Sequence, residues 1–125
     1  MFDWRRPKNL GVIQGKFSPC RRTPNCVSSQ AEPSDKEHYI APLKGRLQDV
    51  RRAVESLPRT RIISADSHYL YAEFRSRLLR YVDDVEFLFD GNVIHVRSAS
   101  RLGRRDFGVN RARVEQLRKM ITPKP

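Results

Sequence analysis

The chain has 125 residues, of which 38% are hydrophobic and 31% charged, and its 25 lysines and arginines against 14 acidic residues give a formal charge of +11. This length allows one domain with a modest core, and the apolar content excludes a wholly disordered chain. No apolar run approaches the roughly 20 residues that span a membrane, and no signal-peptide pattern is present, so we expect a cytoplasmic protein.

The basic residues are mostly arginine, and no lysine stands between Ser67 and Arg118. A guanidinium group offers a planar fork of donors that matches a carboxylate or a phosphate, so this bias favours oxyanion recognition. The alternative is that arginine simply serves wherever a surface base is needed.

The first 42 residues hold five of the eight prolines and show no sustained hydrophobic periodicity. Such composition is typical of irregular structure. We therefore predict a flexible N-terminal arm over residues 1–17, followed by a single compact domain over residues 18–125.

A helix is predicted over about residues 43–57. Apolar residues recur there at steps of three and four and form one stripe, which consists of Leu43, Leu47, Val50, Val54 and Leu57. Charged and polar residues occupy the other face, and Pro58 ends the helix because proline lacks the amide hydrogen.

The segment from Tyr69 to Tyr81 fits both a helical and an alternating pattern. We favour a strand, because Asp66-Ser67 and Asp83-Asp84 bracket it as turn residues would. The string "VEFLFD", then Gly91-Asn92, then "VIHVRSAS" predicts a β-hairpin over residues 85–100.

A second helix is predicted over about residues 107–121, with Phe107, Val114, Leu117 and Ile121 on its apolar stripe and Asp106 or Asn110 as its N-cap. The resulting fold class is α+β: a small antiparallel sheet of about four strands packed against two helices.

Four strings in order carry a family resemblance: "PNCVSS" at 24–29, "AEFRSR" at 72–77, "DDVEF" at 83–87 and "VRSASRLGRRDFGVNR" at 96–111. Together they resemble the family catalogued as domain of unknown function 1499, over residues 18–118. The resemblance implies a small bacterial protein with relatives in plastids, one compact domain and no assigned activity. Members often have proline after the first cysteine, whereas here Arg21 follows Cys20.

Five residues separate Cys20 from Cys26, unlike the spacing of most zinc half-sites, and no further cysteine or histidine pair completes four ligands. We therefore expect no metal and no cofactor. The two cysteines are either free or paired, and a free Cys26 would be a buried structural residue. A nucleophilic Cys26 would need His68 or His95 as its base, whereas a catalytic role for Ser28 or Ser29 rests on residue type alone.

The string "RSASRLGRRDFGVNR", from Arg97 to Arg111, joins the last strand to the last helix and combines arginines with two glycines. With the strand face that carries Glu73, it forms our candidate ligand site, which consists of Arg75, Arg77, Arg97, Arg101, Arg104 and Arg111. The alternative is a solvated sheet face with cross-strand ion pairs, to which Asp83 and Asp84 would contribute.

The leading hypothesis is a non-enzymatic binding module whose arginine-rich face takes an acidic protein partner or a small oxyanion. Nucleic-acid binding is an alternative that rests mainly on the charge of +11. We do not favour it, because the charge is spread along the chain and no aromatic residues are interleaved with the arginines. A thiol- or serine-dependent enzyme is the third hypothesis.

Overall fold

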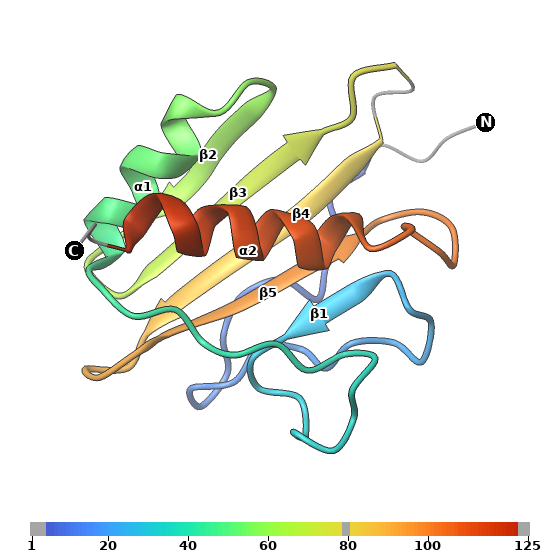
Figure 1. Ribbon diagram of the computed structural model, residues 1–125, viewed down its shortest axis with the longest axis horizontal. Coiled ribbons are helices and arrows are strands. Elements are labelled where there is room, and N and C mark those ends of the chain that lie inside the picture. Colours follow the sequence, from blue (N-terminus) through green and yellow to red (C-terminus); the bar gives the residue numbers. More distant parts are fainter. Residues whose placement is uncertain (1–4, 79–80, 123–125) are drawn as a thin grey trace.

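The computed structural model describes residues 5–78 and 81–122, and in them the chain forms one five-stranded antiparallel sheet and two helices (Figure 1). The strands lie in the order β1-β5-β4-β3-β2. The elements are β1 (Cys26–Ser28), α1 (Leu47–Ser56), β2 (Thr60–Ala65), β3 (Tyr69–Arg75), β4 (Val82–Phe89), β5 (Ile94–Ser100) and α2 (Val109–Ile121).

The predicted α+β class is confirmed, with five strands in place of about four. The additional strand is β1, which is only three residues long and pairs with the outer edge of β5. A three-residue strand within "PNCVSS" is too short to show a period of two, so the sequence carried no signal for it.

Both helices lie on one face of the sheet (Figure 1). The hydrophobic core is the layer between the helices and the sheet. Alternation along β3 directs Leu70, Ala72 and Phe74 into this layer, as predicted for a strand. Val54 of α1 and Leu117 of α2 meet them and are fully buried.

Both helices begin later than predicted. Leu43 is buried but lies outside α1, because its backbone pairs with Ile94 of β5 and Gly45 then turns the chain with a φ of 136°. At α2, Gly108 has a φ of 80° and precedes the first helical turn. Phe107 is therefore not part of the apolar stripe; it is 94% exposed.

Asp83 and Asp84 are not turn residues, as the sequence suggested, but lie inside β4. The preceding strand, β3, ends at Arg75, and the turn that follows is closed by Ser76 and Tyr81, whose backbone groups bond at 2.8 Å. Residues 79–80, which the predicted strand would include, lie outside the described residues.

The N-terminal arm, as far as it is described, crosses the sheet face opposite the helices (Figure 1). Arg6 bonds the Glu73 carboxylate of β3, and the backbone amide of Gly11 donates to Glu86 of β4 at 2.7 Å. Residues 1–4 of the predicted arm lie outside the described residues. The sheet is thus covered on both faces.

The segment between β1 and α1 is anchored by His38, whose imidazole is 10% exposed. Its Nδ1 lies 2.8 Å from the Asp35 carboxylate and its Nε2 lies 2.9 Å from the Thr23 carbonyl. Burial lowers the pKa of this imidazole, but the Thr23 carbonyl and Asp35 outweigh burial and raise the pKa above its ordinary value.

We predict a pH-dependent contribution of His38 to stability. A histidine whose pKa is raised on folding stabilises the protein fully below its unfolded pKa of about 6.5, and this contribution is lost as the pH rises through the folded pKa. The melting temperature of His38→Gln should therefore fall further below that of the parent at about pH 5.5 than at about pH 8.5. His68→Gln, in an exposed turn, is the control. An NMR titration that places the His38 pKa at or below 6.5 would contradict this account.

Candidate functional site

Charged side chains gather on the sheet face beneath the arm. Glu73 on β3, Asp84 and Glu86 on β4 and Arg97 on β5 occupy strand positions that alternate with the core residues, and each is at least 95% buried. Three carboxylates in such a place require cationic or hydrogen-bonding partners, because an unpaired buried charge is very costly.

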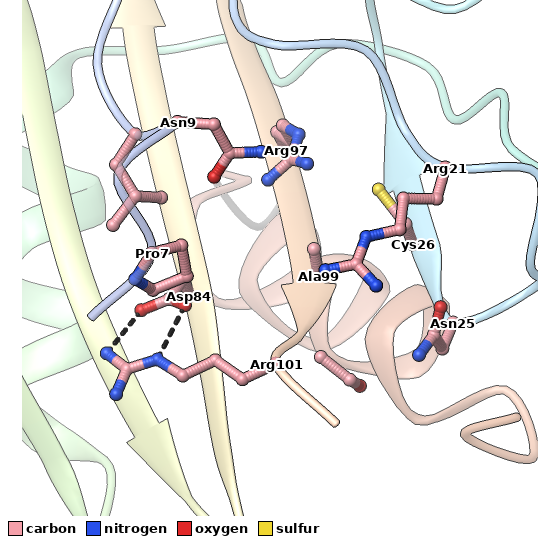
Figure 2. Close-up of a pocket in the computed structure, with 11 residues that line it drawn as sticks. Pro7, Asn9, Arg21, Asn25, Cys26, Asp84, Arg97, Ala99 and Arg101 are labelled. Carbon is pink, nitrogen blue, oxygen red and sulfur yellow. Dashed lines mark hydrogen bonds and ion pairs between the residues drawn. The ribbon is translucent and has the colours of Figure 1, made fainter. Parts of the chain in front are cut away.

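Arg101, immediately after β5, is the partner of two of these carboxylates. Its Nε and Nη2 donate to the two oxygens of Asp84, each at 2.8 Å (Figure 2). Nη2 also lies 2.6 Å from Glu73. The Tyr71 hydroxyl donates to Asp84 as well, and Arg6 approaches Glu73 from the arm to 2.9 Å. Burial raises the pKa of Glu73, but Arg101 and Arg6 together hold it below its ordinary value.

Arg97 is held less completely. Its Nη1 lies 3.9 Å from Glu86 Oε1, beyond hydrogen-bond distance, and Nη2 reaches the Pro19 carbonyl only at 3.4 Å. Among the described residues its buried Nε has no hydrogen-bond partner, and neither has Glu86 Oε1. Glu86 Oε2, by contrast, accepts from the Tyr69 hydroxyl and from the Gly11 amide.

A cavity of about 40 Å³ opens beside Arg97 between the arm, β1 and β5 (Figure 2). The residues that line it are Pro7, Asn9, Leu10, Arg21, Asn25, Cys26, Asp84, Arg97, Ala99, Ser100 and Arg101. In Figure 2 the Arg21 side chain extends from its loop toward β5, and Asn9 on the arm points toward Arg97. Burial lowers the pKa of Arg97; Glu86 and Asp84 oppose this effect, whereas Arg21 adds to it.

A disulfide between Cys20 and Cys26 closes the loop that carries Arg21. The sequence left open whether these cysteines are free or paired, and the structure pairs them. Cys26 is buried, lines the cavity and is the first residue of β1. The disulfide bond therefore fixes one end of the loop to β1. The thiol-dependent hypothesis would require this bond to be reduced first.

The six arginines of the predicted site do not form one surface. Arg97 and Arg101 line the same cavity, and the Arg101 side chain is only 5% exposed because buried carboxylates hold it. Arg75 is the last residue of β3, and its guanidinium lies 3.7 Å from the Glu73 carboxylate. Arg77 lies beyond β3, so Arg75, Arg77 and Arg97 do not form a row on one face of the sheet.

The other two members lie elsewhere. Arg104 is exposed in the loop before α2, and Arg111 on α2 donates to the carbonyls of Lys36 and Glu37. Sequence reasoning missed Arg21 and Asn9. The signal for Arg21 was its place directly after Cys20.

Ser29, one of the serines considered as a nucleophile, lies just after β1 and contacts a histidine. Ser29 Oγ lies 2.9 Å from His95 Nδ1, and His95 Nε2 lies 3.2 Å from the Asp90 carboxylate. The same Oγ accepts the Val96 amide at 2.9 Å, and Ser29 is 7% exposed. These contacts tie the chain after β1 to β5, and we interpret them as structural because the serine oxygen is occupied and buried.

Comparison with known proteins identifies the family but no activity. The model of the family described as "Protein of unknown function (DUF1499)" matches residues 16–121, most of the chain, and the chain belongs to this family. No curated protein and no solved structure shows significant similarity to it. In the described residues, no helix is long and apolar enough to cross a membrane, and no group of three or more histidine, cysteine or acidic side chains could hold a metal ion.

We predict that Arg101 is a determinant of stability. Arg101→Gln would leave Asp84 and Glu73 buried without their main cation, and breaking a buried pair in this way typically costs about 3–5 kcal/mol in the free energy of unfolding. Arg104→Gln removes the same charge from an exposed position and should change it by less than about 0.5 kcal/mol. Urea unfolding of both variants measures the difference; similar small losses would mean that the Arg101 contacts are not maintained in solution.

Proposed function

We propose that this DUF1499 domain is a non-enzymatic binding module that holds a small oxyanion in the cavity between Arg21 and Arg97. One observation carries the proposal. The Arg97 guanidinium is 6% exposed, its Nε has no partner among the described residues, and it borders a cavity that a second arginine also lines.

The chemistry of the two arginines fits this ligand. A guanidinium donates two parallel hydrogen bonds to a pair of oxygens, and a buried donor that stays unpaired costs about 1–3 kcal/mol. An oxyanion at this position would satisfy the Arg97 donors. It would also lie between two like charges, whose repulsion already contributes to the lowered pKa of Arg97.

The remaining polar groups around the cavity leave it electropositive. Asp84 is engaged by Arg101 and Tyr71, and its charge is offset by that guanidinium. Asn25 directs its amide nitrogen to the carbonyls of Leu102 and Gly103, so it shapes the cavity wall. The Asn9 side chain is the neutral group that we expect to contact the anion beside Arg97.

The volume of the cavity limits the size of the anion that it can hold. A bound water needs about 10–15 Å³, and the cavity offers about 40 Å³, so it accommodates a group of only a few non-hydrogen atoms. Formate, nitrate, bicarbonate, sulfate and phosphate are of this class. A nucleotide or a folded acidic partner is too large, which places nucleic-acid and acidic-protein binding second for this site.

We predict that Arg21→Gln weakens anion binding without weakening the fold. Arg21 is exposed, so its loss should change the free energy of unfolding by less than about 0.5 kcal/mol. Binding of the best anion in a panel of phosphate, sulfate, nitrate and formate should fall at least tenfold, about 1.4 kcal/mol. Isothermal titration calorimetry in a buffer without competing oxyanions measures both the affinity and the stoichiometry.

Arg22→Gln is the matched control, because Arg22 is the exposed neighbour of Arg21 in the same loop and does not line the cavity. It removes the same charge and should leave the affinity nearly unchanged. Equal losses in the two variants would indicate bulk electrostatics, and the absence of saturable binding by every anion of the panel would refute the site.

A further inference from the structure

The two most exposed large apolar side chains of the described residues lie at the same end of the sheet. Phe107, in the loop between β5 and α2, is 94% exposed, and Leu78, in the loop after β3, is 88% exposed. Both loops leave the same end of the sheet because β4 begins where β5 ends: Asp83 pairs with Ser100, and the Arg101 amide donates to the Val82 carbonyl (Figure 1).

The backbone holds Phe107 in its exposed position. Its φ is 53°, in the left-handed region that bulky residues rarely adopt. The Asp106 carboxylate accepts the amides of Gly108 and Asn110 at 2.9 and 3.1 Å, which fixes the turn on both sides of the ring. An aromatic side chain held outward at such a cost to the backbone is a feature that function explains better than folding.

Exposed arginines accompany both apolar side chains. Arg104 and Arg105 stand just before Phe107, and Arg77 stands just before Leu78. The acidic residue in this loop, Asp106, is occupied by the backbone amides at the start of α2. We call Arg77, Leu78, Arg104, Arg105 and Phe107 the loop-tip surface.

We propose that the loop-tip surface docks on an anionic lipid bilayer, with Phe107 and Leu78 inserted at headgroup level and the arginines on lipid phosphates. Apolar side chains beside basic residues are the elements of such peripheral binding, and the guanidinium fork matches a phosphate diester. The formal charge of +11 attracts the whole molecule to such a surface.

The geometry favours a bilayer over a protein partner. A stable protein interface needs a contiguous, well-packed patch of roughly 800 Å² on each side. The loop-tip surface offers separate side chains on two loops, and Val109, two residues after Phe107, is 48% exposed. Side chains on separate loops can enter a fluid interface independently. This proposal does not depend on the oxyanion cavity.

The test is co-sedimentation of the full chain with vesicles of phosphatidylcholine alone and of an equimolar mixture with phosphatidylglycerol. We expect binding to the mixed vesicles only. The double variant Phe107→Ser/Leu78→Ser should lower the partition coefficient about tenfold, and Arg104→Gln/Arg105→Gln should lower it by a similar factor. Circular dichroism and melting temperature confirm that each variant is folded.

The controls separate this surface from bulk properties. Ile13→Ser removes a 79%-exposed apolar residue from the N-terminal arm, and Arg51→Gln/Arg52→Gln removes two exposed charges from α1, on the other side of the molecule (Figure 1). Both should bind mixed vesicles like the parent. Equal losses in the controls, unchanged binding by Phe107→Ser/Leu78→Ser, or retention on duplex DNA without vesicle binding would each overturn the proposal.

Discussion

The contact of Arg101 with Asp84 and Glu73 is the interaction on which the rest of the structure depends. It joins the end of β5 to the first residues of β4 and the last residues of β3, and through Glu73 it also reaches Arg6 on the arm. An antiparallel sheet often leaves its second face to water. Here the N-terminal arm covers that face, so the carboxylates beneath it must be paired within the protein, and Arg101 supplies most of that pairing.

Arg97 differs from Arg101 in a way that separates structure from function. Both side chains are buried on the same side of the sheet, yet Arg101 makes several contacts of 2.6–2.8 Å, whereas among the described residues the nearest approach of Arg97 to a carboxylate is 3.9 Å. A buried ion pair that only served stability would gain from closing this gap, since the desolvation cost is already present. Under the proposed function, an anion beside Arg21 would complete the Arg97 contacts that this gap leaves open.

Local sequence patterns were sufficient to predict most helices and strands. They were insufficient to predict contacts between segments that are distant in the sequence. The pattern of residues 69–81 was ambiguous and the bracketing turn residues favoured a strand there, whereas the turn at Gly91-Asn92 identified the hairpin of β4 and β5 directly, because that signal is local. Leu43 kept its predicted burial but belongs to a bridge with Ile94, since burial alone does not distinguish a helix from an isolated pairing. The cavity lies where the arm, the disulfide loop and β5 come together, and no local sequence pattern predicts that these three segments are close in space.

The arginines of this chain fall into three physical groups, and the net charge counts them together. Arg101 is consumed by buried carboxylates, and Arg113 lies over the Phe74 ring at 4.8 Å while it pairs with Asp83. Arg97 and Arg21 line the cavity, and a third group, which includes Arg51 and Arg104, is exposed. The formal charge of +11 already subtracts the acidic partners, so it does not say where on the surface the excess cations lie. The role of each arginine in this fold therefore depends on how deeply it is buried and on what it contacts, more than on the number of arginines.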